Sequence, residues 1–332
     1  MLRPGPKNLI TDVAGLLVGH ATDDAVQSGV TALLCSAGWS AGVDVRGGGP
    51  GVRETETLAA ENLVGRAHAI VLSGGSVFGL AAADGVAAAL SVRGVGLHLR
   101  ADSPAIPIVP GAVLHDLGNA GNKDWGESPP YRELGIRALQ SAGCEFALGS
   151  VGAGRGAMAG LVKGGVGSAS LDLGEGLVVG ALVALNSIGS VFMPDGLTYW
   201  AWAFELDGEL GGASPPTSRM DLSDPCPDGS RLAEMGRLQP GANTTLGVVG
   251  CTADLSTAEC KRVAMMAHDG IARAVRPAHT PFDGDTLFAL ASAAVPLPRA
   301  PRRAAMLARI GSAAADCVSR AIARAVHEAR AQ

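Results

Sequence analysis

The sequence predicts a mixed α/β protein, and two patterns support this fold class. Aliphatic or β-branched runs bounded by glycine occur at residues 30–35, 69–72 and 177–185, and such runs are typical of buried strands. Segments with helical spacing of apolar residues lie between and after them, at 77–90 and 256–275. Strands that alternate with helices along a chain indicate a sheet covered by helices.

Weaker signals add further elements. Residues 54–66 and 132–142 have helical spacing and, with 77–90, are predicted to form helices in the first half of the chain. Residues 200–206 alternate aromatic with small side chains, a pattern that favours a strand.

Two helices are predicted near the C-terminus. Ser256 and Glu259 form a capping box at the start of helix 256–275, because a serine is followed three residues later by glutamate. A last helix begins after Pro301, with apolar residues on one side and arginines on the other. That pattern favours a surface helix packed on a sheet over a helix that binds a membrane surface.

Composition restricts the class of protein. Glycine contributes 47 of 332 residues, about twice its average share, while aromatic residues contribute 4% and hydrophobic residues 47%. Glycine and proline together stay below the share typical of disordered chains, and the glycines lack the three-residue period of collagen. We therefore expect a compact protein whose core is built from small aliphatic side chains.

Several partners are disfavoured by the same counts. The net charge is −5 and no run of basic residues occurs, so nucleic acid is not an expected partner. We find no apolar stretch of ~18 residues and no signal-peptide core, so a membrane is not expected either. Six scattered cysteines without a C-x-x-C pair indicate reduced thiols, a cytoplasmic protein and no zinc site.

A long loop is predicted at residues 207–243, where proline and glycine are too dense for a regular element. It ends at Asn243-Thr244, which begins a predicted strand. Net charge changes here, from −9 for residues 1–243 to +4 for residues 244–332. Two pieces of opposite charge joined by an exposed loop could stay together after a cut at this point.

Glycine clusters at residues 46–51 and 73–79 precede predicted helices and could hold phosphate on backbone amides. Neither cluster matches a Walker A sequence or a clean G-x-G-x-x-G, so tight turns and close packing are favoured over nucleotide binding. The sequence also lacks G-x-S-x-G and H-E-x-x-H, which leaves no basis for a serine hydrolase of the α/β type or for metal catalysis.

The Asn243-Thr244 junction could carry chemistry. A threonine hydroxyl is a weak nucleophile, but at the first position of a chain its own α-amine can act as the base. That amine has a pKa of about 7.7–8, which suits a general base near neutral pH. The amine would be created by cleavage between Asn243 and Thr244; an ordinary strand entry is the alternative interpretation.

Downstream, Asp283-Gly284-Asp285 presents two carboxylates one residue apart. They point to the same side if the segment is extended, and they could then orient a threonine ammonium and hydroxyl and tune their pKa values. A solvent-exposed Asp-Gly-Asp turn is the simpler alternative.

Long ordered motifs carry a resemblance to a known family; they lie at residues 44–55, 70–80, 163–170, 180–186 and 243–246. With them the chain resembles the DmpA-type N-terminal-nucleophile aminopeptidases and amidases. Within that family it is most similar to the endo-type 6-aminohexanoate-oligomer (nylon oligomer) hydrolases, because an Asn-Thr junction occurs together with an Asp pair.

The resemblance implies a four-layer αββα sandwich of the type shared with ornithine acetyltransferases. It implies one domain, residues 1–332, that cuts itself between Asn243 and Thr244 into chains 1–243 and 244–332. Thr244 would be the catalytic nucleophile that cleaves amide bonds, in nylon oligomers or related linear oligoamides, through an acyl-enzyme. Lys163 would lie near it, Asn186 would bind the oxyanion, and Asp283 and Asp285 would form the family's Asp pair. The resemblance implies no cofactor. It does imply a homo-oligomer of cleaved protomers, with a tetramer as the expectation.

Departures from the family leave the substrate open. The stretch from Asn186 to Thr244 is long, and the family's assisting tyrosine has no clear counterpart: Asp124 and Trp125 occupy the region, and Tyr131 is only a candidate. The alternatives are an N-terminal or β-peptide aminopeptidase, an acetyltransferase of the ornithine type, and an uncleaved small-molecule-binding or assembly scaffold.

Overall fold

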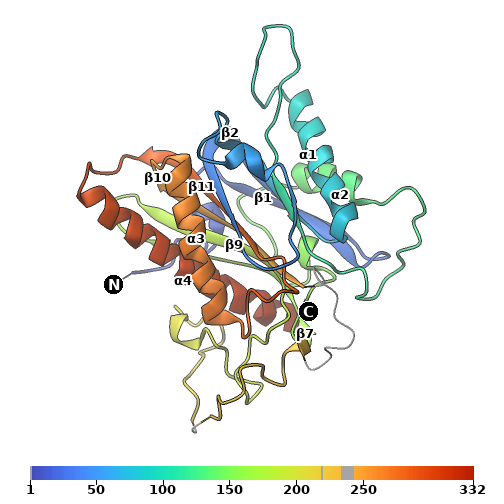
Figure 1. The fold of residues 1–332 in the computed structure, drawn as a ribbon, viewed down its shortest axis with the longest axis vertical. Coiled ribbons are helices and arrows are strands. Elements are labelled where there is room, and N and C mark those ends of the chain that lie inside the picture. The colour runs from blue at the N-terminus through green and yellow to red at the C-terminus, as the bar shows by residue number, and fades with distance from the viewer. Residues whose placement is uncertain (1, 218–219, 233–242) are drawn as a thin grey trace.

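The computed structural model describes residues 2–217, 220–232 and 243–332, and one sheet dominates it (Figure 1). Nine strands form this sheet, in the order β3-β5-β4-β2-β11-β10-β9-β8, with β1 paired to β2. The pairs β10–β11 and β4–β5 are parallel and the others antiparallel. A short two-stranded hairpin, β6 with β7, lies beside it. The strands are β1 Leu17–Asp23, β2 Ser28–Val45, β3 Gly51–Arg53, β4 Arg66–Ser73, β5 Gly111–Val113, β6 Met158–Ala159, β7 Val162–Lys163, β8 Gly165–Asp172, β9 Val178–Asn186, β10 Thr244–Ala253 and β11 Thr286–Val295.

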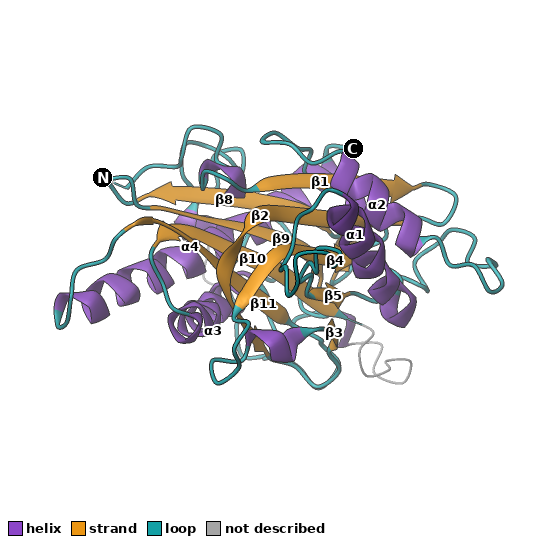
Figure 2. Ribbon diagram, turned by 90° about the horizontal axis from the view of Figure 1, so that it is seen from above, coloured by secondary structure: helices purple, strands orange, loops and turns teal. Residues whose placement is uncertain are grey.

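Within the part of the chain that the structure describes, four α-helices cover the sheet. Helices α1 and α2 lie over one half, and α3 and α4 lie over the other, as Figure 2 shows from above. The helices are α1 Ala81–Val92, α2 Tyr131–Gln140, α3 Thr257–Ala274 and α4 Arg302–Arg330, and short 3₁₀ turns are η1 Ile10–Asp12, η2 Thr55–Leu58, η3 Ser76–Leu80, η4 Gly152–Gly154 and η5 Trp202–Phe204.

Three hydrophobic cores show how the layers are stacked. In β10, Val249 belongs to the core under α3 and α4, whereas its neighbour Val248 belongs to a central core. In β4, Val71 belongs to the core under α1 and α2, whereas Leu72 points into the same central core. Because strand side chains alternate between faces, the curled sheet folds onto itself around the central core. This gives the predicted αββα layering.

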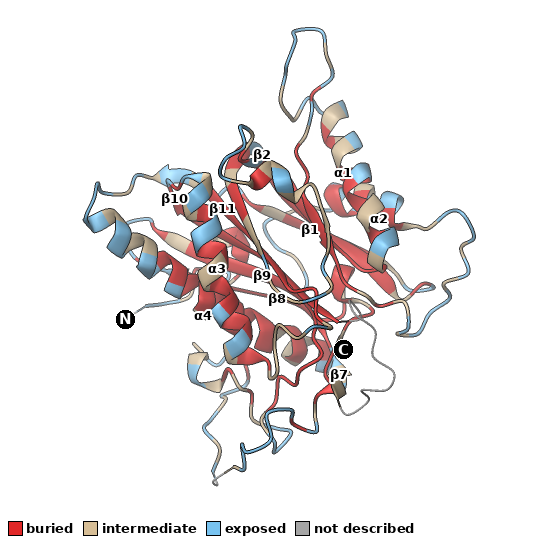
Figure 3. Cartoon of the chain, viewed as in Figure 1, coloured by how far each residue is buried: buried red, intermediate tan, exposed pale blue. Residues whose placement is uncertain are grey.

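Small residues let these layers approach closely. A Cβ added to Gly167 of β8 would lie 1.9 Å from the Ala321 carbonyl oxygen of α4, and one added to Gly270 of α3 would lie 2.2 Å from the Ala315 oxygen. Larger side chains would force the helices apart. The first turns of α4 are largely exposed, whereas most residues from Ile310 to Ala329, among them Arg320, are buried (Figure 3). Part of the glycine surplus is therefore a packing requirement.

Most predicted elements are confirmed. The strands at 30–35, 69–72 and 177–185 lie in β2, β4 and β9. The helices at 77–90, 132–142 and 256–275, and the one after Pro301, correspond to η3 with α1, α2, α3 and α4. Ser256 caps α3 as predicted, accepting from the Glu259 amide at 3.3 Å. A strand begins at Thr244, as predicted.

Two predicted elements are wrong. Residues 54–66 form only the short turn η2 before β4 begins, because the following segment is exposed and has no apolar face to bury; Leu63 is fully exposed. Residues 200–206 contain the turn η5 and no strand: Trp200 and Phe204 lie instead against the guanidinium groups of Arg276 and Arg273.

The described part of the predicted loop at 207–243 contains no α-helix and no strand beyond an isolated bridge at Asn243; residues 218–219 and 233–242 lie outside the described residues. Among the helices of the described chain, none has the length and hydropathy needed to cross a bilayer.

Candidate active site

Thr244 is the first residue of β10 and lies inside the molecule, 1% exposed. Every residue of β10 is buried, so the strand holds its first residue rigidly. Its cross-strand neighbour in β9 is Asn186. On the other side, Asn243 forms a bridge with Asp283 just before β11 begins. The fold thus places two residues that are distant in sequence beside the Asn243–Thr244 bond. Asn186 comes about 60 positions before Thr244, and Asp283 comes 40 positions after Asn243.

The peptide bond between these two residues has an unusual environment. The Thr244 hydroxyl donates to the carbonyl oxygen of Asn243, the residue that precedes it. The same oxygen accepts a hydrogen bond from the Gly284 amide at 2.9 Å. Both side-chain polar atoms of Asn243 are buried and lack a hydrogen-bond partner within the described ranges. The threonine oxygen therefore lies beside a carbonyl that a backbone N–H already polarises.

Gly284 has to be glycine for steric reasons. A Cβ at this position would lie 2.8 Å from Thr244 Oγ1, 2.7 Å from the Gly49 carbonyl oxygen and 3.2 Å from Pro50 Cα. The glycine cluster at 46–51 is consequently part of the site. The Gly49 amide donates to the backbone carbonyl oxygen of Asp283 at 2.9 Å, so this cluster packs on the backbone of the Asp pair.

Asp285 anchors Thr245, the residue after Thr244. Its Oδ1 accepts from the Thr245 amide at 2.6 Å, and its Oδ2 accepts from His279, from Nδ1 at 2.7 Å and from the backbone amide at 3.2 Å. The carboxyl group is 1% exposed, and a polar group at this depth needs such partners. The His279 ring in turn meets the buried ring of His268 edge to face, with ring centroids 5.0 Å apart.

Asp283 is held by Thr280, and its pKa is raised. Its Oδ2 accepts from the Thr280 amide at 2.8 Å and from the Thr280 hydroxyl at 2.7 Å. Burial, together with the charge of Asp285, raises the pKa of Asp283 to about 6. Both carboxyl groups are buried, so the alternative of a solvent-exposed Asp-Gly-Asp turn is wrong; that the two point to the same side stays a prediction.

Asn186 is fixed by both ends of its amide. Its Oδ1 accepts from the Met158 amide at 2.9 Å, and its Nδ2 donates to the His115 carbonyl oxygen at 3.1 Å. Lys163 is the cross-strand partner of Met158 in the β6–β7 hairpin. Because the Met158 amide is the one that binds Asn186, Met158 connects Lys163 to Asn186. The Lys163 side chain is exposed and has no hydrogen bond or ion pair to the residues that the structure describes.

The aromatic candidates lie elsewhere. Tyr131 is fully buried, and its hydroxyl donates to Ser28 Oγ at 3.1 Å. Trp125 packs edge to face on Tyr131, with ring centroids 5.8 Å apart. Within the described ranges neither residue hydrogen-bonds to Thr244. Both side chains stabilise the region around α2.

Sequence reasoning missed His279 and His268, and it gave Gly284 no steric role. His279 is six residues before its partner Asp285 and has a left-handed backbone (φ 56°), which no periodic pattern indicates. His268 lies on the buried face of α3, where burial lowers its pKa to about 4 and keeps it neutral at pH 7. The one signal that the sequence offers is the number of polar side chains within residues 279–285.

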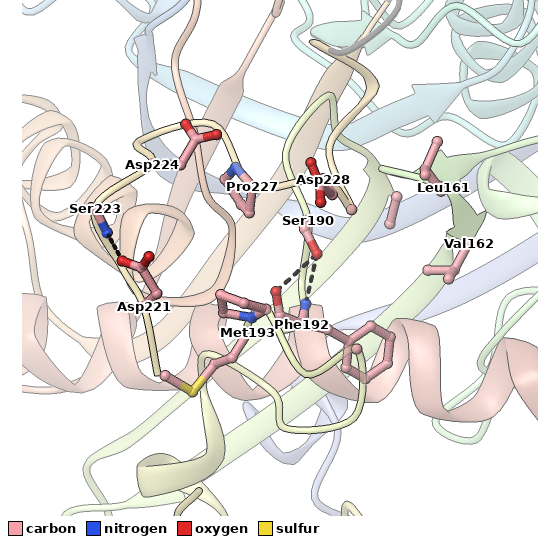
Figure 4. A pocket seen from close by; sticks show the side chains of 14 residues that line it. Leu161, Val162, Ser190, Phe192, Met193, Asp221, Ser223, Asp224, Pro227 and Asp228 are labelled. Carbon is pink, nitrogen blue, oxygen red and sulfur yellow. Dashed lines mark hydrogen bonds between the residues drawn. The ribbon is translucent and has the colours of Figure 1, made fainter. Parts of the chain in front are cut away.

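Two cavities flank this region. One, of about 280 Å³, lies between the β6–β7 hairpin and the 207–243 loop, and Figure 4 shows Leu161 and Val162 facing Asp228 and Met193 across it. The other, of about 460 Å³, is lined by residues 49–52 together with Ser76, Val77, Leu80, Val113 and His115. Of these two cavities, the second is lined by Gly49 and Pro50. Atoms of both residues, like Thr244 Oγ1, lie close to the position that a Cβ on Gly284 would take.

Metal chemistry has no obvious site here. Across the described ranges, no group of three or more His, Cys, Asp or Glu side chains could hold a metal ion. The six cysteines are free thiols.

An amide-bond hydrolase is the class of protein that fits this fold and site, and comparison with known proteins agrees. The chain belongs to peptidase family S58, whose model matches residues 8–332. It is similar to an uncharacterized aminopeptidase of Mycobacterium tuberculosis, with 43% identity over 97% of this chain and 94% of that protein. It is also similar to the 6-aminohexanoate-oligomer endohydrolase of Kocuria sp., with 29% identity over 90% of this chain and 78% of that protein.

Solved structures show the same fold. A β-aminopeptidase of Burkholderia sp. superposes with a TM-score of 0.68 at 24% identity, covering 98% of this chain and 88% of that one. The L-aminopeptidase D-Ala-esterase/amidase of Ochrobactrum anthropi, described as a variant of the Ntn hydrolase fold, gives 0.68 at 22% identity over 97% and 86%. The predicted family and fold class are confirmed. Identity to the mycobacterial aminopeptidase exceeds identity to the endohydrolase.

Proposed function

We propose that this chain is a self-processing amidase whose nucleophile is Thr244, released by cleavage of the Asn243–Thr244 bond. One observation carries the proposal. The Thr244 hydroxyl contacts the carbonyl oxygen of Asn243, and the Gly284 amide donates to that same oxygen at 2.9 Å. A nucleophile and an oxyanion donor therefore already flank one peptide bond.

The cleavage step follows from this geometry. Thr244 Oγ1 attacks the carbonyl carbon of Asn243, and the carbonyl oxygen takes up negative charge beside the Gly284 amide. The C–N bond then breaks, the nitrogen of Thr244 takes the hydroxyl proton and becomes an amine, and an ester joins the two chains through Oγ1. Water hydrolyses the ester, leaving a carboxylate on Asn243 and a free Thr244 amine.

In the mature enzyme the Thr244 amine is the general base for its own hydroxyl. It takes the hydroxyl proton while Oγ1 attacks a substrate amide, and it returns that proton to the leaving amine. Water then releases the acyl group. Asn186 contributes to the oxyanion site in this proposal, and loss of one such donor typically costs about 10²–10³ in rate. Asp285 positions Thr244 through Thr245, and Lys163 adds positive charge at the mouth of the site.

Linear oligoamides are the proposed substrates, as in the endohydrolases that this chain resembles. The Asn-Thr junction with its Asp pair supports this choice. An aminopeptidase is the second candidate, because the chain is 43% identical to a protein of that name.

The proposal is tested by trapping the acyl-enzyme. Purified protein is incubated with p-nitrophenyl hexanoate at pH 7 and the reaction is quenched in acid. Mass spectrometry of the 244–332 chain is expected to show one added hexanoyl group on its first residue. A label on another residue, or an intact 332-residue chain that still hydrolyses amides, would refute the assignment of Thr244. Transfer of the acyl group to ornithine in preference to water would indicate an acetyltransferase instead.

A further inference from the structure

We propose that His268 is a positioning residue of the active site: through His279 it holds the Asp285 carboxyl group against the Thr245 amide. This inference rests on the function proposed above, and it gives a role to a buried side chain of α3 that the proposed reaction does not use. Two unpaired ring nitrogens and two short hydrogen bonds support it.

Two imidazole rings in contact each carry a buried nitrogen without a partner. The rings of His268 and His279 meet edge to face, with centroids 5.0 Å apart. Nδ1 of His268 and Nε2 of His279 are both buried, and neither has a hydrogen-bond partner among the residues that the structure describes. Because buried polar atoms are almost always hydrogen-bonded, the two nitrogens indicate a link between the rings, made directly or through one water molecule.

His268 takes the acceptor's part in this link. Its Nε2 lies 3.0 Å from the Asp44 carbonyl oxygen, which can only accept, so the ring proton is on Nε2. Burial lowers the pKa of His268 to about 4, so the ring is neutral at pH 7 and carries no second proton. Nδ1 is therefore a buried acceptor, and the Nε2–H of His279, or a water between the rings, can supply the donor that it lacks.

The other nitrogen of the His279 ring is bonded to the Asp pair. Nδ1 lies 2.7 Å from Oδ2 of Asp285, whose Oδ1 accepts from the Thr245 amide at 2.6 Å. The His279 side chain is 21% exposed, so solvent leaves its ring room to turn, and the fully buried His268 ring is a neighbour that restrains it. A turned His279 ring would release the carboxyl group that fixes Thr245, the residue next to Thr244.

Asp44 and Arg46, in the first motif of the family resemblance, hold His268 in place. Oδ2 of Asp44 lies 3.6 Å from the His268 Nε2 and accepts from the Arg46 Nε at 2.8 Å. The Arg46 guanidinium also donates to the Met265 carbonyl oxygen of α3 at 3.2 Å, and its backbone amide donates to the Asp285 carbonyl oxygen at 2.8 Å. The same short segment therefore anchors the helix that carries His268 and the backbone of Asp285.

The experiment compares His268→Asn with His268→Leu. The two new side chains have nearly the same shape and both lose the donor to Asp44, but asparagine keeps an acceptor near the position of Nδ1. Leucine suits a buried helix position better than asparagine does, so a role in packing alone predicts that His268→Leu is at least as active as His268→Asn. His98→Leu is the control, because His98 is exposed and lies in the loop between α1 and β5.

Two quantities are measured: kcat and KM with p-nitrophenyl hexanoate as the probe, and hydrogen exchange of the Thr245 amide by NMR. His268→Leu is expected to lower kcat about tenfold at unchanged KM, since a shift of well under 1 Å costs less than the ~100-fold of a full 1 Å. Exchange at Thr245 should become faster in this variant, and His268→Asn should recover most of both losses. Because His268 acts through His279, the double variant His268→Leu/His279→Ala should be no slower than His279→Ala alone. His98→Leu should change neither quantity.

Two results would overturn the positioning role: a leucine variant as active as the asparagine variant, or a double variant whose loss is the product of the two single losses. If His268→Leu does not fold, His268→Phe replaces it, because phenylalanine keeps a ring and removes both nitrogens.

Amide exchange separates this failure from failure of the proposed function, because it needs no activity. An unmodified protein that stays uncleaved and inactive refutes the proposed function. In that protein, faster exchange at Thr245 in His268→Leu than in His268→Asn would still support the positioning of Asp285, and equal exchange in the two variants would refute it.

Discussion

Replacing Gly284 by alanine tests the geometry at the Asn243–Thr244 bond, where we propose that the chain is cut. The new Cβ would lie 2.8 Å from Thr244 Oγ1 and 2.7 Å from the Gly49 oxygen. Both distances are below 3.0 Å, a separation that real Cβ atoms essentially never show, and the second contact is with backbone, which yields little. The threonine side chain must therefore move. A displacement approaching 1 Å at a reacting atom costs about 10²-fold in rate.

We expect Gly284→Ala to slow self-cleavage about 100-fold and to lower the free energy of unfolding by about 1–3 kcal/mol through overpacking. The assay follows the conversion of the full-length chain into two fragments on denaturing gels after rapid purification. Gly118→Ala is the matched control, because a Cβ there meets nothing within 4 Å and Gly118 is exposed. If Gly284→Ala cleaves as fast as the unmodified protein, the reasoning about this contact is wrong.

Four further predictions concern the Asp pair and the chain interface. Because the pKa of Asp283 is raised to about 6, its carboxylate forms only as pH rises through 6; activity that needs this charge should fall below pH 6, and Asp283→Asn should remove that inflection from the pH–rate profile. The raised pKa also means that Asp283 contributes less stability as pH rises from about 4 to 6, which urea unfolding at both pH values can measure. His279→Ala should lower kcat about tenfold by freeing Asp285, whereas His279→Asn, which keeps a donor near Nδ1, should recover most of it. Glu209→Gln should cost about 3–5 kcal/mol, because Glu209 is buried against Arg320, with Oε1 to Nε at 2.5 Å.

Each of these predictions has a contrasting measurement. An Asp283→Asn profile with the same inflection would assign the ionisation to another group. Equal rates for His279→Ala and His279→Asn would mean that the histidine acts through packing alone. Glu209 lies before the proposed cut and Arg320 after it, so Glu209→Gln should also ease separation of the two chains in urea. Arg155→Ala, which breaks an exposed pair with Asp24, should cost less than ~1 kcal/mol.

The sequence predicted those parts of the fold that depend on local signals. Helix α3 was identified by its capping box, because Ser256 and Glu259 act within one turn. The helix predicted at 54–66 failed because propensity alone does not form a helix without a face to bury, and Leu63 is fully exposed. The strand predicted at 200–206 failed because aromatic alternation was read as sheet packing, whereas Phe204 lies against Arg273.

The candidate site was only partly predictable for a similar reason. Motif resemblance pointed to Thr244, Asn186 and the Asp pair, and the structure brings these residues together around one peptide bond. Their roles stay predictions. The hydrogen bond from His279 to Asp285 and the contact of Gly284 with Thr244 arise from a left-handed turn and from a close backbone approach, which spacing in the sequence does not encode.

The central claim is that Thr244 becomes the first residue of a chain, and intact mass with N-terminal sequencing tests it most directly. Purified protein, incubated until no further change occurs, should give one chain of residues 1–243 and one of 89 residues that begins with Thr244. Thr244→Ala should remain a single chain. A stable 33.3 kDa species from the unmodified protein, or cleavage of Thr244→Ala at the same bond, would contradict the account.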